Sequence, residues 1–294
     1  MYFIFNKSPK YSGNSRTLER LAELLKIEKT EYLLNELIAI NAYNFGKIKN
    51  DKKLNFIIIV GGTDINFTIK KNPEKYESVK KVFIDAKYVV VFSKYMCKII
   101  EKYYKISPDK IKIIPQSVPK KLKSSKYDLR EVFPQIEGRK IYISVGNLRP
   151  VKRPKYLFNF FKKSTDSCLI HIGKILEGQY IFPKNVYHIN GLSKKKVYSC
   201  MKQAVGLINT SISEGMALSI LESMKLKCPV YAFKNLGNLS IIKHGFNGFI
   251  FYDIRSLKFL LTLPTKKIIN TAYDYVYIKH SCRMERHEYL ELID

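Results

Sequence analysis

Two glutamates, Glu214 and Glu222, stand eight residues apart in a stretch between an expected strand and an expected helix. Gly215 allows a sharp turn, and the apolar spacing becomes helical from about Met216. Free amides and the helix dipole at such a start form an anion site. Those amides would belong to Gly215, Met216, Ala217 and Leu218. A diphosphate is the kind of anion that this terminus would hold.

The two carboxylates are better interpreted as separate groups than as a helical pair. Eight residues along a helix rotate Glu222 by about 80° from Glu214. Glu214 would lie in the loop, whereas Glu222 in the helix could accept hydrogen bonds from vicinal hydroxyls such as those of a ribose. A second interpretation stays open, in which Glu214 caps the helix and Glu222 is a solvated helix residue.

Short β-branched or aromatic runs alternate with longer amphipathic segments, as in parallel sheets covered by helices. The expected strands of the first half are 2–5, 37–41, 55–60, 88–92 and 112–114. Those of the second half are 141–145, 168–172, 186–189, 205–208, 230–232 and 248–251. Helices are expected at 15–25 and 93–104. The pattern predicts two Rossmann-like α/β domains, with ligands bound between them at the carboxyl ends of the strands.

The Lys- and Ser-rich stretch that follows Pro119 lacks periodicity and is the best candidate for a linker. We therefore expect an acceptor-side domain over residues 1–137 and a second domain over 138–278. Residues 279–294 should form a C-terminal helix that packs back toward the first domain. Met284, Tyr289 and Leu292 would form its apolar stripe.

The formal net charge is +27, from 52 Lys and Arg against 25 Asp and Glu. Such an excess favours anionic partners, and a peripheral contact with an anionic membrane is compatible with it. A bias of composition toward Lys, Ile, Asn and Tyr explains the charge about equally well. A basic protein that binds nucleic acid is a rival interpretation, but most aromatic residues lie within apolar runs, as core residues do.

The five cysteines are far apart and form no C-x-x-C pair, and the five histidines show no metal-ligand spacing. We expect neither a disulfide framework nor a metal site. The apolar run within the first ten residues is too short for a signal peptide, and no run approaches the ~20 apolar residues that a membrane span needs. The expectation is a reduced, cytoplasmic protein.

The stretch from Glu214 to Glu222 resembles the E-x7-E motif of family four retaining glycosyltransferases. Residues 237–238 and 243–249 resemble loops that follow this motif. Upstream, the block from Gly146 to Lys152 resembles the strand-to-helix loop in which a basic pair holds the donor diphosphate. Lys152 matches the family lysine, whereas the family arginine position holds Asn147, and Arg149 is the candidate to assist.

The resemblance extends along nearly the whole chain to one branch of that family. It is carried by residues 12–14, 61–66, 148–152, 213–216 and 283–293.

The resemblance implies a GT-B architecture of two Rossmann-like domains and transfer of a sugar from a nucleotide-sugar donor with retention of configuration. Glu214 would contact the donor sugar, Glu222 the ribose, and Lys152 the departing diphosphate. Gly146, Asn147 and Gly13 would also lie at the donor. No metal cofactor is implied, and the chain contains no D-x-D pair.

Three alternatives keep this fold. One is a nucleotide-sugar epimerase, and another is a phosphorylase, which would need a Schiff-base lysine that nothing in the chain singles out. The third binds the donor without turnover.

The first domain should hold the acceptor, whose identity the sequence leaves open among a glycan, a lipid-linked sugar and a protein. Gly62 would let the backbone approach a ligand, and Thr63 and Asp64 follow it. Asp64 could accept a proton or a hydrogen bond from an acceptor hydroxyl. An ordinary tight turn explains the same residues, and a turn with a helix cap explains Gly13 and its neighbours.

Overall fold

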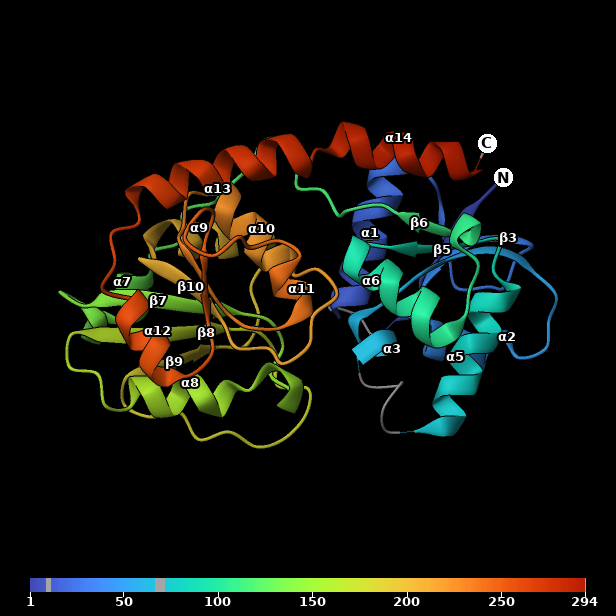
Figure 1. Ribbon diagram of the computed structural model, residues 1–294. Coiled ribbons are helices and arrows are strands. Elements are labelled where there is room, and N and C mark those ends of the chain that lie inside the picture. Colours follow the sequence, from blue (N-terminus) through green and yellow to red (C-terminus); the bar gives the residue numbers. More distant parts are fainter. Residues whose placement is uncertain (9–11, 67–71, 294) are drawn as a thin grey trace. The chain divides into compact units, whose positions relative to one another are not determined.

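Figure 1 shows the computed structural model of the chain, which describes residues 1–8, 12–66 and 72–293. The chain folds into two units. Unit 1 comprises Met1–Ser117 together with the residues from Cys282 onward, and unit 2 comprises Val118–Ser281. Each unit contains one six-stranded sheet. Every strand pairing in both sheets is parallel.

The sheet of unit 1 has the strand order β2-β1-β3-β4-β5-β6. Its strands are β1 Phe3–Phe5, β2 Lys29–Thr30, β3 Glu36–Ile40, β4 Asn55–Ile59, β5 Tyr88–Val91 and β6 Ile111–Ile113. The chain passes from β1 to β2 on one side and then crosses to β3 on the other. The strand order therefore reverses between β1 and β3, and parallel sheets bind ligands at the carboxyl ends of strands at such a point.

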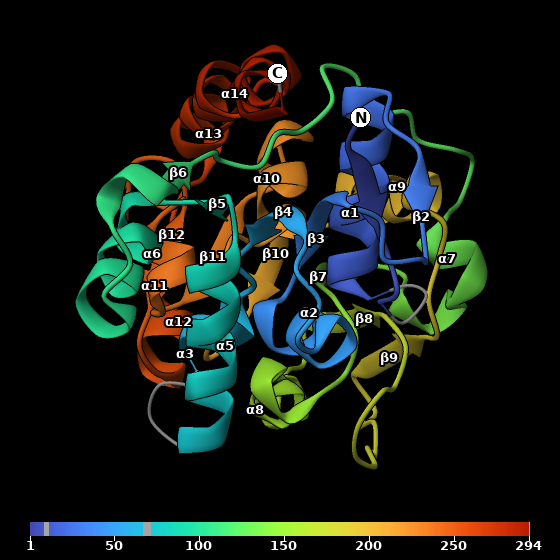
Figure 2. The same cartoon turned by 90° about the vertical axis from the view of Figure 1, so that its right-hand side faces the viewer.

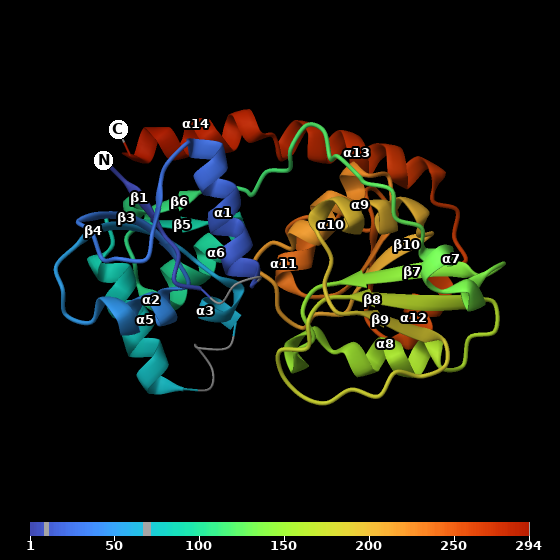
Figure 3. The same cartoon turned by 180° about the vertical axis from the view of Figure 1, so that it is seen from behind.

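Helices cover both faces of this sheet (Figure 3). The helices of unit 1 are α1 Gly13–Leu25, α2 Ala42–Lys49, α3 Gly62–Asn66, α5 Pro73–Asp85, α6 Lys94–Ile99 and α14 Cys282–Ile293. Helix α1 contacts α14 on one face, and α2 contacts α5 on the other. Ser12, Asn41 and Ser93 cap α1, α2 and α6 through their side chains, which explains where these helices begin.

The sheet of unit 2 has the strand order β12-β11-β10-β7-β8-β9. Its strands are β7 Lys140–Val145, β8 Ser167–Ile172, β9 Val186–Ile189, β10 Gly206–Asn209, β11 Val230–Phe233 and β12 Phe249–Phe251. This is the order of the dinucleotide-binding fold, and it reverses between β7 and β10. The loops that follow these two strands therefore meet at one edge of the sheet.

Two layers of helices enclose the sheet of unit 2 (Figure 1). The helices are α7 Leu129–Val132, α8 Pro154–Phe161, α9 Lys194–Gln203, α10 Leu218–Lys225, α11 Leu236–Leu239, α12 Ile254–Leu260 and α13 Lys266–Lys279. Helices α8 and α12 share one buried apolar cluster on the sheet. Helix α10 contacts α9 and α13 on the opposite face.

Every strand predicted from the sequence is present, with ends that differ by no more than one residue. The sequence missed β2, because a strand of two residues carries no alternation. The predicted helix 93–104 is wrong in part: α6 ends at Ile99, and a π-helical turn, Ile100–Tyr104, follows.

The apolar stripe predicted for the C-terminal helix is wrong at one position. Tyr289 and Leu292 are buried, but Met284 is 51% exposed. Glu285 takes the buried place instead. Its carboxylate is paired with Arg20 of α1, so an ion pair replaces the expected apolar contact.

Residues 118–137, which the sequence assigned to the first domain, belong to unit 2. The backbone amide of Leu129 donates to Gln203 Oε1 at 2.9 Å, and Gln203 Nε2 donates to the Tyr127 carbonyl at 2.7 Å. The Ser125 amide donates to the Lys195 carbonyl. The expected linker thus packs against α9.

Within the described ranges, no helix is long and apolar enough to cross a membrane.

Candidate active site

The loops that follow β7 and β10 are joined where the strand order of unit 2 reverses. Lys152 lies in a 3-10 turn, Pro150–Lys152, after β7. Its carbonyl accepts a hydrogen bond from Thr210 Oγ1 at 2.7 Å, and the Val151 carbonyl accepts one from the Ile212 amide at 3.0 Å. These bonds hold the loop that carries Lys152 against the loop that carries Glu214.

Lys152 and Glu214 form an ion pair, with 2.6 Å between Nζ and Oε1. Their side chains are 24% and 12% exposed, so the pair is largely shielded from water. Asn209 Nδ2 also donates to Glu214 Oε1, at 3.2 Å. The structure therefore brings together two of the predicted catalytic residues and adds Asn209, which the sequence analysis did not single out.

Glu214 is ionised near neutral pH. Its burial by itself would raise the pKa of the carboxyl, but Lys152 and hydrogen bonds from Ser211 and Asn209 outweigh burial and lower this pKa. The pair contributes stability above the ordinary pKa of a glutamate, and this contribution is lost as the pH falls through the lowered value. At neutral pH, Glu214 can only accept hydrogen bonds, as a contact with sugar hydroxyls would require.

Asparagines fix the shape of the loop before Glu214. Asn209 Oδ1 accepts from the Ser211 amide at 3.0 Å, and Asn238 Nδ2 donates to the same oxygen at 3.4 Å. Asn235 Nδ2 donates to the Ser211 carbonyl at 2.7 Å. Asn209 is the last residue of β10, and a polar residue at the end of a buried strand is the signal that could have revealed it.

Gly237 in α11 packs directly against Glu214. A Cβ atom at Gly237 would lie 2.2 Å from the Glu214 carbonyl oxygen and 2.6 Å from the carbonyl carbon. Only glycine permits this approach, so α11 supports the backbone of the glutamate from behind.

Helix α10 begins at Leu218 and not at about Met216, because Ala217 keeps an extended backbone, with φ −76° and ψ 105°. Ala217 is the N-cap, and no side chain among the described residues caps the helix there. Gly215 and Met216 consequently lie in the loop, and Leu218 opens the helix. The backbone amides at this terminus are not satisfied by a capping side chain, which keeps it suited to an anion.

Glu222 lies within α10 and is held by Tyr198 of α9. The Tyr198 hydroxyl donates to Glu222 Oε1 at 2.9 Å. The interpretation of Glu222 as a purely solvated residue is therefore wrong, because a neighbouring helix orients its carboxylate. No sequence signal points to Tyr198, since its contact with Glu222 joins two helices.

The turn after β7 is fixed by its neighbour β8. The Gly146 carbonyl oxygen lies 2.9 Å from His171 Nε2, and Asn147 Oδ1 accepts from the Lys174 amide at 3.0 Å. A Cβ at Gly173 would come within 2.0 Å of the Gly146 oxygen. Asn147 thus uses its side chain to hold the loop after β8.

His171 is neutral at physiological pH. Burial lowers the pKa of its imidazole to about 4, and the neighbouring His188 and Lys152 act in the same direction. A neutral ring has one N–H, and that N–H can donate to the Gly146 carbonyl.

Arg149 lies between β7 and the 3-10 turn. Its Nε is buried and has no hydrogen-bond partner among the described residues. A buried donor of this kind is costly to leave unpaired, so this atom is suited to an acceptor from a ligand.

The remaining predicted residues lie in unit 1. Gly13 is the first residue of α1, next to the capping Ser12. Gly62 opens α3, and the side chain of Thr63 lies outside the described part of the chain.

Asp64 is 1% exposed. Its carboxylate accepts from the amides of Gly61 at 2.8 Å, Ala42 at 3.1 Å and Tyr43 at 3.4 Å. Burial raises its pKa to about 6, although these amides oppose that shift. Asp64 thus holds the turn after β4 to the turn after β3.

No group of three or more His, Cys, Asp or Glu side chains in the described segments could hold a metal ion.

The chain is similar in sequence to a known family and to a curated protein. Residues 125–256 match the family described as glycosyl transferases group 1. Glycosyltransferase 1 domain-containing protein 1 of Xenopus tropicalis is 31% identical, over 96% of this chain and 94% of that protein.

Solved structures show that the fold is GT-B. HepE of Anabaena in complex with UDP-glucose is similar with a TM-score of 0.82 and 14% identity, over 99% of this chain and 98% of HepE. Sucrose-phosphate synthase of Thermosynechococcus elongatus has a TM-score of 0.73 and 13% identity, over 95% and 76% of the two chains.

Proposed function

Because this chain belongs to the glycosyl transferases group 1 family and is a glycosyltransferase, we propose that it transfers a sugar from a nucleotide-sugar donor with retention of configuration. The observation that carries this proposal is the Lys152–Glu214 ion pair beside the start of α10. The cation and the uncapped helix amides can bind the diphosphate of a nucleotide-sugar. The carboxylate can accept hydrogen bonds from the hydroxyls of the sugar.

Lys152 acts on the leaving group. As the bond between the sugar and the diphosphate breaks, negative charge grows on the diphosphate, and an ammonium close to it stabilises that charge. The partial burial of Lys152 strengthens this interaction because less water screens it. The chain has no D-x-D pair, and we propose that Lys152 and the start of α10 stabilise the charge of the departing diphosphate without a metal.

Glu214 and Glu222 act on hydroxyl groups. Glu214, held by Asn209 and backed by Gly237, accepts hydrogen bonds from the donor sugar. Glu222, oriented by Tyr198, accepts from the ribose of the nucleotide. These are the roles of the two glutamates in the family four retaining enzymes that the motif resembles.

Arg149 completes the diphosphate site. Asn147 stands where the family has arginine, and its side chain holds the loop after β8. Arg149 lies on the same loop with a buried Nε that lacks a partner among the described residues. We assign it the second contact with the diphosphate.

A uridine nucleotide is the donor to test first, since HepE was solved with UDP and with UDP-glucose. The experiment is a thermal-shift screen of the purified protein against UDP, GDP, ADP and their common sugar conjugates. A ligand at a hundredfold excess over its Kd stabilises the folded protein by about 2.7 kcal/mol, which is visible as a rise in Tm.

Glu222→Ala should lose this response, because the ribose contact is removed. Glu131→Ala, which removes an exposed glutamate of α7, is the matched control and should keep it. Transfer with retention is then read from the anomer of the product by NMR, with and without EDTA. A protein that no nucleotide stabilises contradicts the proposal, as does a product of inverted configuration or a reaction that EDTA abolishes.

A further inference from the structure

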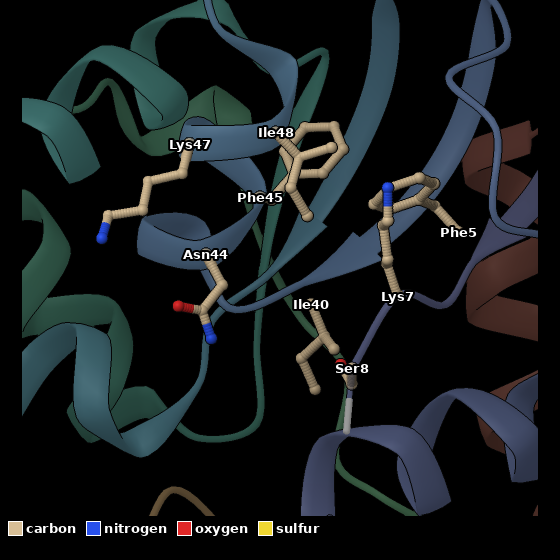
Figure 4. Close-up of a pocket in the computed structure, with 8 residues that line it drawn as sticks. All are labelled: Phe5, Lys7, Ser8, Ile40, Asn44, Phe45, Lys47 and Ile48. Atoms are coloured by element: carbon tan, nitrogen blue, oxygen red, sulfur yellow. The ribbon is translucent and has the colours of Figure 1, made fainter. Parts of the chain in front are cut away.

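Unit 1 contains a pocket of about 300 Å³, and Figure 4 shows the side chains that line it. Its two lysines, Lys7 and Lys47, point to opposite sides of the lining, so they form no paired cation site. A cation that two aromatic rings hold in place lies in unit 2 instead. It is Arg153, which directly follows Lys152 in the chain.

The backbone of Arg153 is in the left-handed region, with φ 49° and ψ 49°. This region is disfavoured for a residue that has a Cβ atom. Pro154 follows, and the residue before a proline favours an extended backbone. Arg153 nevertheless ends the 3-10 turn that carries Lys152, and α8 begins directly after it. Such a conformation persists only where the surrounding structure holds it.

The side chain of Arg153 is held by two rings. Its guanidinium carbon lies 4.3 Å from the centre of the Tyr156 ring and 4.4 Å from that of the Phe233 ring. The ring centres are 6.3 Å apart, with 71° between the ring planes, so the guanidinium lies in the corner that they form. A cation at such a distance is attracted by the face of each ring. All three side chains are half-buried, and the partial loss of water strengthens this attraction.

The loops that carry Lys152 and Glu214 lead away from each other. The first continues into α8 and the second into α10, and these helices lie on opposite faces of the sheet (Figure 2). The Lys152 loop therefore needs a fixed point on the side of α8 if Lys152 is to stay at Glu214. The contacts of Arg153 with Tyr156 of α8 and Phe233 at the end of β11 provide that point.

The left-handed turn at Arg153 also fixes the backbone of Lys152. The Lys152 carbonyl accepts from Thr210 Oγ1 at 2.7 Å, and the Arg153 carbonyl lies 3.5 Å from the same hydroxyl. Thr210 is in the loop before Glu214, so the turn brings two successive carbonyls to that loop. From this backbone position, Lys152 Nζ reaches Glu214 Oε1 at 2.6 Å.

We propose that Arg153 is a positioning residue of the candidate active site. Its contacts with the two rings hold the left-handed turn, and this turn directs Lys152 to Glu214 and to the donor diphosphate. The part that concerns the diphosphate rests on the proposed function. Lys152 meets the ligand, and Arg153 acts through Lys152.

The position of Lys152 can be measured without any ligand from the pKa of Glu214. Burial raises this pKa, and Lys152 and hydrogen bonds from Ser211 and Asn209 lower it. Carboxyl-carbon NMR of the full chain with isotope-labelled glutamate follows the titration, and the signal of Glu214 is the one that Glu214→Gln lacks. Arg153→Met keeps the length of the side chain, removes its charge and should raise the pKa of Glu214. Arg153→Lys should restore most of the wild-type value, because an ammonium also binds to the face of an aromatic ring.

Tyr156→Leu removes one of the two rings and should raise the same pKa by less than Arg153→Met does. Lys155→Met, at an exposed lysine of α8, is the matched control for loss of a positive charge and should leave this pKa unchanged. A pKa of Glu214 that Arg153→Met does not change overturns the inference, as does an equal rise in Lys155→Met. Equal values in Arg153→Lys and Arg153→Met overturn the contacts between cation and rings as the cause.

Calorimetric titration with UDP separates positioning from direct contact. Arg153→Met should weaken UDP binding by about fivefold, as expected when contacts between a cation and two rings are lost. It should have no further effect in a protein that already carries Lys152→Ala, because Arg153 acts through Lys152. An equal weakening in both backgrounds overturns the inference, since Arg153 would then contact the diphosphate itself.

The two proposals fail in different ways. A raised pKa of Glu214 in Arg153→Met, in a protein that no nucleotide stabilises, supports the positioning of Lys152 and contradicts the proposed function. Stabilisation by UDP, together with an unchanged pKa of Glu214 in Arg153→Met, overturns this inference and leaves the proposed function standing.

Discussion

At the scale of single residues, the Lys152–Glu214 ion pair sets the charge of the candidate active site. Lys152 Nζ and Glu214 Oε1 are 2.6 Å apart, so the two charges neutralise each other and the pair carries no net positive charge. A diphosphate that binds there must compete with the carboxylate for Lys152. The proposed roles of the two residues can therefore be separated by removing one charge at a time.

Glu214→Gln removes the negative charge and keeps the size of the side chain. We expect transfer to fall by about a hundredfold, because an interaction with the reacting sugar is lost. UDP should bind no more weakly than before, since Lys152 no longer has a competing carboxylate. Turnover and UDP titration measure the two effects, with Glu131→Gln as the control. Unchanged turnover would show that Glu214 does not act on the donor.

His171 makes stability depend on pH. Its pKa in the folded protein is about 4, below the ordinary value of 6.5. The unfolded chain binds more protons between these values, so stability is lost as the pH falls from about 6.5 toward 4.

His171→Gln should reduce the loss of unfolding free energy between pH 7 and pH 5 by about 2 kcal/mol. Urea titrations at the two pH values measure this difference. His287→Gln, at an exposed histidine, is the control for replacement of an imidazole by an amide. An identical loss in His171→Gln and the wild type would refute the assignment.

At the scale of elements, the candidate site of unit 2 is held in place by contacts from α9, α11 and β8. Helix α11 touches the backbone of Glu214 through Gly237, and α9 orients Glu222 through Tyr198. Strand β8 fixes the turn after β7 through His171 and Gly173. The functional side chains thus depend on elements that carry no reacting group.

Gly237→Ala tests this dependence. Its new Cβ would fall 2.2 Å from the Glu214 carbonyl oxygen, so α11 or the glutamate loop must move. We expect a stability loss of about 1–3 kcal/mol from overpacking and a weaker stabilisation by UDP. Leu236→Ala, at a half-exposed residue of the same helix, is the control for loosening of α11. Wild-type UDP binding in Gly237→Ala would show that the contact does not position Glu214.

At the scale of the whole molecule, the two ends of the chain complete the same unit. Arg20 of α1 pairs with Glu285 of α14, with 2.7 Å between Nη2 and Oε1, and the Ser117 amide donates to the same carboxylate at 2.9 Å. Both side chains are buried. A buried charge that loses its partner is strongly destabilising.

Glu285→Ala should lower the unfolding free energy of unit 1 by about 3–5 kcal/mol, because Arg20 is left buried and unpaired. Urea unfolding followed by circular dichroism measures the loss. Glu288→Ala, at an exposed glutamate of the same helix, should change stability by less than about 0.5 kcal/mol. Equal effects of the two substitutions would show that the buried pair does not anchor α14.

The strands, most of the helices and the motif around Glu214 can be predicted from the sequence alone. Runs such as Phe56 to Ile59 are apolar on both faces, which identifies buried parallel strands. Glycine between a strand and a helix marked the turn at Gly215. These features are local, because side-chain alternation and turn chemistry depend on residues that are neighbours in the chain.

Contacts between groups that are far apart in the sequence became visible only in the folded structure. Lys152 reaches Glu214 across 62 positions, and Arg20 reaches Glu285 across 265. The order of strands in the sheet of unit 2 sets the first encounter, since it decides which loops share an edge, and the packing of α14 against α1 sets the second. The strand order of each sheet also explains why Asn147 holds the loop after β8 and why Asp64 joins the turns after β3 and β4. The packing of α9 against α10 lets Tyr198 orient Glu222.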